Sequence, residues 1–430
     1  MRLLTLGLLL APTAFAANDD LMSIYNDALA TNPALQAAQA AVEAARFDIE
    51  AANAGLRPSI SASTNVNGSE VTRSRSSTTP EGGSSSVDGT ISARLALWGP
   101  AERAGVAAAK AGVSLSETSA KSTLNQLQID IAQRYLDVLN AQAALSAAQA
   151  QEQAVERQLE RAQKRLEVGL GTRVEVDQTQ AAYDNTQVAL IRAEDVLSDA
   201  REALETATNR EISTLTPLSA NYLAGPSRLA LSDVIEQAQA SSAGIQIAQA
   251  QVELAQATLA LKQAGGKPRL DASANYNTAK NLEGGLWGNG YGATLTLSMP
   301  LYTGGKVQAE VASAAASLAK AQAELEDQRR AVKAQARSLF RAIGTQAQTV
   351  RAQAQSIKSA QTAVEATQAA FEVGSGDIID VLNAQSDLNA AQSNYAQARH
   401  QHAALVLQLE QLRGDLTQDD LLALNNQLGR

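Results

Sequence analysis

The chain has few residues of the kinds that do chemistry. Its two histidines, His400 and His402, are two positions apart in a stretch expected to be helical, so their side chains point to nearly opposite sides. Two metal ligands on one helix need a spacing of three or four residues. The sequence has no cysteine, no phosphate loop and no nucleophile elbow. We therefore expect solvent-facing histidines, no cofactor or metal, and no enzymatic activity.

One set of carboxylates follows helical spacing. Asp377, Asp380 and Asp387 share one helical face, because separations of three and ten residues are close to whole turns. If identical copies bring this face to a common axis, the carboxylates form rings that favour cations and repel one another unless a cation pairs with them. Ordinary solvated helix surface is the other interpretation, and the sequence leaves both open.

A repeat shows which elements position these residues. Residues 167–171 (EVGLG) recur as 372–376 (EVGSG), 205 positions later. Other pairs with this offset are Glu175 and Asp380, Val176 and Val381, Gln180 and Gln385, and Tyr135 and Phe340. Upstream, Pro58 and Pro268 are related by an offset of 210. We expect a duplicated unit in residues 17–208 and 229–413, joined by a linker at 209–228 and followed by a tail at 414–430.

Each half is expected to be mainly helical. Residues 101–167 contain no proline and alternate small, polar and apolar positions with helical spacing, so a helix of roughly 100 Å is predicted there. Further helices are expected at 172–208, 305–372 and 377–412. The glycines near 169 and 374 indicate turns at which each long helix folds back as an antiparallel hairpin. A periplasmic coiled-coil rod is the alternative interpretation of these helices.

Four segments alternate strictly between apolar and polar residues, at about 56–67, 90–98, 268–277 and 290–299. This period of two predicts strands, with Leu95 and Leu97 on the apolar face of the second one. An ordinary half-buried sheet would show the same pattern. The alanine-rich helices offer no broad apolar face to cover a sheet, so strands that cross an outer membrane are favoured. Four strands cannot close a barrel, whereas three copies give twelve strands and leave a lumen.

The first residues predict export. Residues 1–16 have a basic residue, an apolar run and a small-residue cleavage site, as in a secretory signal peptide. No later stretch reaches the roughly 20 apolar residues of a membrane-spanning helix. The formal net charge of −9 argues against a nucleic-acid partner.

Beyond these patterns, the mature chain resembles the TolC-type outer-membrane efflux and secretion channels. The likeness rests on segments 165–170 (RLEVGL), 371–374 (FEVG), 378–382 (IIDVL), 300–305 (PLYTGG) and 420–426 (DLLALNN). It implies a homotrimer in a Gram-negative outer membrane, with a twelve-stranded β-barrel continuous with a periplasmic α-helical barrel. It also implies a passive conduit for drugs or proteins, which works with a periplasmic adaptor protein and an inner-membrane transporter. A trimeric surface adhesin or structural rod without a transport role is the alternative.

The resemblance also assigns residues. Docking of the adaptor falls on Val168, Gly169, Leu170, Val373, Gly374 and Ser375. Asp380 matches a constriction aspartate and Glu175 an acidic partner of the closed gate. Asn383 stands where such channels can place a second aspartate, and Gly376 where an arginine can lie. We expect Asp377 and Arg173 to take over those roles.

Overall fold

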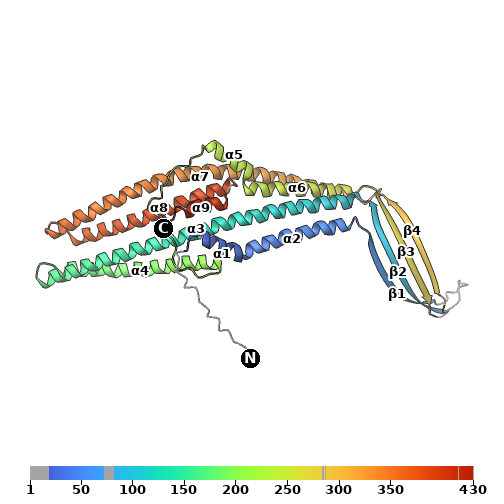
Figure 1. Cartoon of the computed structure of the whole chain (residues 1–430), viewed down its shortest axis with the longest axis horizontal. Coiled ribbons are helices and arrows are strands. Elements are labelled where there is room, and N and C mark those ends of the chain that lie inside the picture. The colour runs from blue at the N-terminus through green and yellow to red at the C-terminus, as the bar shows by residue number, and fades with distance from the viewer. Residues whose placement is uncertain (1–18, 72–81, 283–284, 286, 415, 430) are drawn as a thin grey trace, which may run out of the picture. The chain divides into compact units, whose positions relative to one another are not determined.

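A computed structural model describes residues 19–71, 82–282, 285, 287–414 and 416–429, so the expected signal peptide lies outside the described residues. The described part is mostly helical with one small sheet, as the sequence predicted (Figure 1). The order of two helices, two strands and two helices occurs twice, before a short final helix. The elements are α1 Leu21–Thr31, α2 Pro33–Ala54, β1 Ser59–Val71, β2 Gly82–Trp98, α3 Pro100–Glu167, α4 Arg173–Thr208, α5 Leu231–Ser241, α6 Ala243–Ala264, β3 Arg269–Asn281, β4 Trp287–Ser298, α7 Lys306–Glu372, α8 Ile378–Leu412 and α9 Gln418–Asn425.

The chain divides into two compact units. The first contains residues 1–36, 122–243 and 330–430, and the second contains 37–121 and 244–329. The long helices α3 and α7 contribute residues to both units.

Among the described residues, no helix combines the length and the apolar character that crossing a membrane requires.

The second unit contains the sheet, whose antiparallel strands are in the order β1, β2, β3, β4. Its register places the apolar positions of all four strands on one face. One row across the sheet is Ile60, Ala93, Ala274 and Ala293, and the next is Ala62, Ile91, Tyr276 and Tyr291. Rows of the other face are polar, such as Ser61, Ser92, Asn275 and Gly292. Two short side-chain contacts join β1 to β2 on that polar face, Ser61 Oγ to Ser92 Oγ at 2.9 Å and Asn67 Nδ2 to Asp88 Oδ2 at 2.7 Å.

Strand β2 differs from its expected form at both ends. It begins at Gly82 rather than near 90, because backbone pairing continues through a Gly/Ser-rich stretch in which side-chain alternation gives no signal. At the other end the pairing slips between Ala96 and Trp98, so that Leu97 is the extra residue of a bulge and Trp98 is opposite Leu270. The regular alternation expected for β2 therefore ends at this bulge, since a bulge reverses the faces of the residues that follow it.

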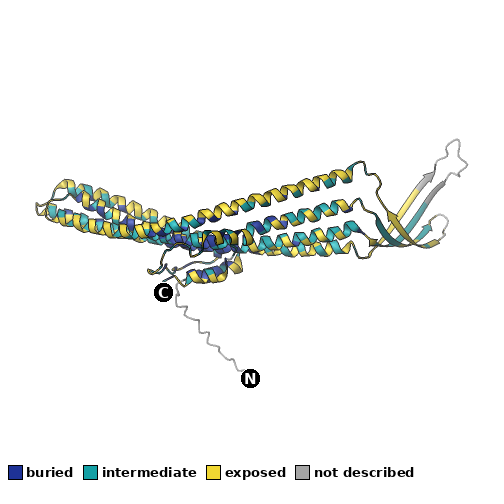
Figure 2. Ribbon diagram, turned by 90° about the horizontal axis from the view of Figure 1, so that it is seen from above, coloured by how far each residue is buried: buried dark blue, intermediate teal, exposed yellow. Residues whose placement is uncertain are grey.

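The described residues leave both faces of the sheet uncovered. None of the strand residues 59–68, 85–98, 269–281 and 287–298 is buried, and Figure 2 shows the described parts of the strands as exposed or intermediate. Ile60, Leu295 and Leu297 on the apolar face are each more than half exposed. Exposed apolar surface on this scale is typical of a face that another molecule or a membrane covers.

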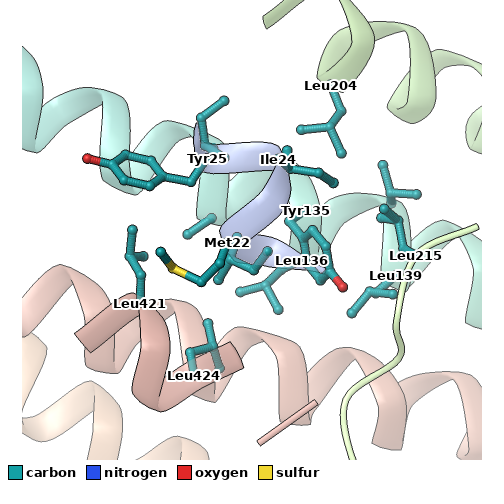
Figure 3. Close-up of a cluster of buried hydrophobic side chains, with 14 of the residues drawn as sticks. Met22, Ile24, Tyr25, Tyr135, Leu136, Leu139, Leu204, Leu215, Leu421 and Leu424 are labelled. Carbon is teal, nitrogen blue, oxygen red and sulfur yellow. The ribbon is translucent and has the colours of Figure 1, made fainter. Parts of the chain in front are cut away.

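The first unit has the main hydrophobic core. Its buried side chains come from α1, α2, α3, α4, α8, α9 and the linker, and Figure 3 shows part of this cluster. Tyr135 of α3 lies at the centre, fully buried, and its hydroxyl donates to the backbone oxygen of Thr216 at 2.7 Å. Because a buried hydroxyl needs a partner, this bond fixes the linker against α3.

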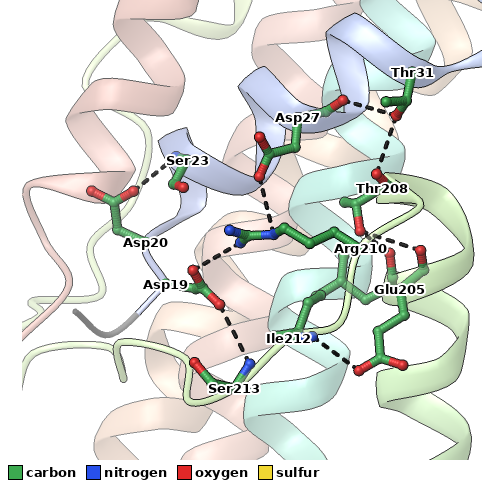
Figure 4. A network of polar contacts seen from close by, with 11 residues as sticks. Asp19, Asp20, Ser23, Asp27, Thr31, Glu205, Thr208, Arg210, Ile212 and Ser213 are labelled. Atoms are coloured by element: carbon green, nitrogen blue, oxygen red, sulfur yellow. Dashed lines mark hydrogen bonds and ion pairs between the residues drawn. The ribbon is translucent and has the colours of Figure 1, made fainter. Parts of the chain in front are cut away.

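A polar network fixes the same linker to α1 (Figure 4). Arg210 pairs with Asp19 at 2.8 Å and with Asp27 at 3.1 Å. Asp20 caps α1 by accepting from the Ser23 amide at 2.8 Å, and Glu205 accepts from the Ile212 amide at 3.0 Å. The start of the described chain and the linker between the repeats are therefore held together by both apolar and charged contacts.

The expectation of solvent-facing histidines was wrong. His400 and His402 are both buried, because segments that are distant in sequence cover this part of α8: Asn140 of α3 contacts His400, and Tyr222 and Gly225 of the linker contact His402. His402 Nε2 donates to the Gly225 carbonyl at 2.8 Å, so its Nδ1 accepts from the Tyr222 hydroxyl at 2.6 Å. Helical periodicity alone cannot show cover from another segment.

Burial makes this region sensitive to acid. Burial, with a smaller effect of the nearby Arg399 charge, lowers the pKa of His400 from 6.5 to about 4, and burial also lowers the pKa of His402. A lowered folded-state pKa stabilises the fold above the unfolded-state pKa, and this stabilisation is lost as the pH falls from about 6.5 towards 4. We expect His400 to contribute about 2 kcal/mol less to the free energy of unfolding at pH 5 than at pH 7.5.

Denaturant unfolding at these two pH values measures the effect. The variants His400→Gln and His402→Gln should each show a smaller loss of stability in acid than the wild type. An unchanged acid dependence in the double variant would show that other groups cause it.

Candidate functional site

The two helical hairpins end in turns of the same backbone geometry. Gly169 and Gly374 follow the long helices with φ of 76° and 80°, in the left-handed region that favours glycine. The Leu170 amide donates to the Arg165 oxygen at 2.8 Å, and the equivalent Ser375 amide donates to the Ala370 oxygen at 2.9 Å. These bonds close each helix as a Schellman motif. We call residues 168–171 tip 1 and residues 373–376 tip 2.

A second glycine in each tip has a different reason. A Cβ on Gly171 would lie 3.1 Å from Arg165 Cβ, and one on Gly376 would lie 3.1 Å from Ala370 Cβ. The chain therefore passes close to the end of its own helix at each tip. Both tips have two glycines at the same spacing because both form the same turn. Gly376, which the resemblance aligned with an arginine, is explained by this close approach.

The acidic residues after each tip begin the returning helix. Thr172 and Glu175 form a capping box, in which Glu175 Oε2 accepts from the Thr172 amide at 3.3 Å. Asp377 caps α8 by accepting from the Ile379 amide at 3.1 Å. Carboxylates at these positions also interact favourably with the helix dipole. Within one chain, Glu175 and Asp377 therefore have a local structural role.

The first turns of α8 separate two kinds of side chain. Asp377, Asp380, Asn383 and Asp387 are exposed, whereas Ile378 and Val381 between them are buried. The shared acidic face that was inferred from spacing is thus one exposed strip of α8. Arg173 is 86% exposed and pairs with Asp177 on its own helix at 3.7 Å rather than with Asp380.

Two contacts between the hairpins were not anticipated. The Arg165 guanidinium lies over the ring of Phe371, 5.0 Å from its centroid, and Gln158 Nε2 donates to Gln368 Oε1 at 2.8 Å. Both contacts join α3 to α7 near the tips. The repeat offset pairs Phe371 with Leu166. This aromatic residue without an aromatic counterpart was the one sequence signal for the contact with Arg165.

The hairpins differ in their internal packing. Phe371, Ile378 and Val381 form a small core in the second hairpin. In the first hairpin the position equivalent to Ile378 is the exposed Arg173. Tip 2 is therefore supported by its own apolar contacts and by Arg165. Tip 1 depends on its backbone bonds, on the capping box and on a hydrogen bond that the Arg165 side chain donates to the Leu170 carbonyl at 3.2 Å.

Both tips expose apolar side chains. Val168, Leu170 and Val373 are 69%, 72% and 79% exposed. In the described part of the chain no group of histidine and acidic side chains is arranged to hold a metal ion. The site therefore offers an apolar surface at the turns beside an exposed acidic strip, which suits contact with another protein and with ions.

Comparisons with known proteins agree with this arrangement. The model of the family "Outer membrane efflux protein" matches residues 24–210 and 234–415. The outer membrane protein TolC of Vibrio cholerae is 30% identical over 271 residues, which cover 60% of this chain and 60% of that protein. TolC of Escherichia coli is 26% identical over 276 residues, which cover 61% and 56%. The aligned part is thus about 60% of each relative's length.

Solved structures share the fold over nearly the whole chain. The outer membrane protein VceC of Vibrio cholerae superposes with a TM-score of 0.78 at 20% identity, covering 92% of this chain and 96% of that one. The CmeC outer membrane channel of Campylobacter jejuni gives a TM-score of 0.80 at 14% identity, covering 96% and 90%.

An open-state structure also shares the fold. The MtrE outer membrane channel of Neisseria gonorrhoeae gives a TM-score of 0.73 at 20% identity, covering 93% of this chain and 91% of that one. At such identities these likenesses show the fold alone. The family match covers both repeats and confirms the resemblance that the tip, strand-exit and tail segments indicated. The chain therefore belongs to the outer membrane efflux protein family and is a protein of the outer membrane.

Proposed function

We propose that this chain is the passive outer-membrane conduit of an export machine, assembled as a homotrimer. The observation that carries the proposal is the sheet, which has one apolar face, one polar face and no cover from the part of the chain that the structure describes. Such a sheet is suited to lipid on one side and to a water-filled lumen on the other.

The edges of the sheet support assembly from several copies. Within the described residues of one chain, β1 and β4 each have only one neighbouring strand. Unpaired backbone groups are not tolerated in hydrocarbon, so other copies must pair with these edges. Two copies would give an eight-stranded barrel that side chains nearly fill, whereas three give twelve strands and room for cargo.

The helical hairpins supply the periplasmic part of the proposed conduit. Three copies would contribute the long hairpins of α3–α4 and α7–α8 to an α-helical barrel. The exposed apolar residues of the tips would then meet a periplasmic adaptor driven by an inner-membrane transporter. The matched and near-identical turns support this, because one adaptor motif could bind both.

The exposed strip of α8 supplies the proposed constriction. Around a three-fold axis Asp380 would form a ring of carboxylates, with Asp377 and Asn383 one turn to either side. The contact of Arg165 with Phe371 would hold the two hairpins of each protomer together near this ring. Arg173 is proposed to meet a neighbouring protomer, since within its own chain it faces solvent.

Transport through such a tube needs no catalytic group, so we infer that the protein is not an enzyme. Its cargo is whatever the inner-membrane transporter delivers, either small drugs or secreted proteins. Removing the protein from its host tests the role: dye accumulation should rise if the machine expels small molecules, and a secreted protein should disappear from the medium if it exports proteins. If neither process changes, the conduit proposal is wrong.

The lipid-facing assignment predicts a large effect of charge at one position. Ala293→Arg places a cation on the apolar face near the middle of β4 and should destabilise the folded protein in a bilayer by about 2–4 kcal/mol. Thr294→Arg is the matched control, because its side chain is on the polar face of the same strand. Urea unfolding of the protein in lipid vesicles measures both. Equal destabilisation by the two changes would show that the faces are assigned wrongly.

A further inference from the structure

One row of the sheet carries a positive charge on the apolar face. Val66, Val87, Lys280 and Trp287 are directly opposite one another across the four strands. The Lys280 ammonium lies 5.1 Å from the ring centroid of Trp287. This row is at the hairpin-loop ends of the strands, whereas their other ends lead to helices.

The position of this row matches the edge of a lipid-facing band. Trp287 and Leu297 are ten residues apart on the same face of β4, which is roughly 34 Å along an antiparallel strand. With the tilt of about 35–45° of outer-membrane strands, this is a height of about 24–28 Å, and the apolar band of such barrels is about 25 Å tall. Leu297 and Trp287 therefore mark its two boundaries.

The residues near the loop end agree with a boundary. Tyr276 and Tyr291 form a cross-strand pair on the same face as Trp287, and the pair Thr278 and Asn289 lies between them and the row of Trp287. Trp287 is 69% exposed. Tyrosine and tryptophan are enriched where hydrocarbon meets headgroups. A charged side chain on the lipid face is costly at mid-membrane and nearly free at the interface, so Lys280 also fits the headgroup level.

We propose that Lys280, supported by Trp287, binds the phosphate of a lipid headgroup. The inference rests on the proposed membrane-spanning role of the sheet. The ring face of Trp287 attracts and orients the ammonium, which still has N–H donors to offer. A lipid phosphate is the anion available at this depth, and its oxygens are strong acceptors of charge-assisted hydrogen bonds.

Native mass spectrometry of the assembly released from nanodiscs tests this site. The nanodiscs contain phosphatidylcholine with either bisphosphorylated lipid A or the same lipid A after removal of its phosphates. The wild type should retain the phosphorylated lipid, and Lys280→Gln should retain about tenfold less, as expected for loss of one charged hydrogen bond. The matched control is Lys267→Gln, which removes the same charge at the opposite end of the hairpin and should leave retention unchanged.

The outcomes separate this site from the conduit itself. Two results would overturn the phosphate site in proteins that still insert and conduct. One is equal lipid retention by the wild type and Lys280→Gln, and the other is an equal loss of retention in Lys280→Gln and Lys267→Gln. Retention of the dephosphorylated lipid as strongly as the phosphorylated one would also overturn it. A wild type that fails to insert into any bilayer would instead contradict the proposed function.

Discussion

Replacing the tip glycines with valine is expected to abolish export while leaving the assembled protein in the outer membrane. Gly169 and Gly374 have φ of 76° and 80°, which a β-branched residue adopts only with strain. Gly169→Val and Gly374→Val should therefore deform the turns and displace the exposed valine and leucine side chains that we assign to adaptor docking. Drug resistance of cells that express each variant, at matched protein levels, measures the effect.

Two further variants separate the turn from a general loss of stability. Gly344→Val makes the same change in the middle of α7, where an added Cβ meets nothing within 4 Å and φ is helical, so export should persist. Gly374→Asn should keep much of the export that Gly374→Val loses, because asparagine tolerates the left-handed conformation. Normal resistance with both valine variants at the tips would show that docking lies elsewhere.

Neutralising Asp380 is expected to change the cation selectivity of the channel and its block by multivalent cations. Three copies of this exposed carboxylate around one axis would concentrate cations at the narrowest part of the tube. Asp380→Asn is nearly isosteric, so it should lower cation selectivity and weaken block by a trivalent cation about tenfold, which corresponds to about 1.4 kcal/mol. Planar-bilayer recordings of the purified protein measure both quantities.

The comparison variants are chosen to keep the fold. Asp377→Asn should have a smaller effect in the same direction, and asparagine can still cap α8. Asp199→Asn removes an exposed charge in α4 and should change neither selectivity nor block. If Asp380→Asn also changes neither, the acidic strip is ordinary solvated surface and the constriction is formed by other residues.

Residues that hold the tips closed should affect conductance rather than selectivity. Phe371→Leu removes the ring over which the Arg165 guanidinium lies but keeps an apolar side chain for the small core. It should raise the conductance of the closed channel, and so should Arg173→Ala if Arg173 meets a neighbouring protomer. Unchanged conductance in both variants would assign closure to other contacts.

Local patterns were enough to predict the long helices, the tips and the four strands, apart from the early start and the bulge of β2. The two tips could be inferred because each needs a glycine with positive φ and a second glycine at a close approach, and the sequence repeats both. The two faces of the sheet could be inferred because each strand alternates between apolar and polar residues, and the strand pairing places apolar residues opposite one another. Both features depend on neighbouring residues, which the sequence displays directly.

Long-range contacts could not be predicted in the same way. His402 is buried because Tyr222 and Gly225, about 180 residues away, cover it. Arg165 meets Phe371 only because two hairpins pack together, and Leu97 lies in a bulge that the alternation does not signal. The proposed roles of Asp380 and Arg173 depend on contacts between copies. The structure of one chain gives the positions of these residues but not their partners in the assembly.

The mass of the folded protein in a mild detergent tests the central claim most directly. One chain offers a four-stranded sheet with two unpaired edges, and our account requires three copies to close it around a lumen. Light scattering corrected for bound detergent should give three times the mass of one chain, with unfolding and dissociation in a single step. A stable, folded monomer with its strands intact would contradict the account.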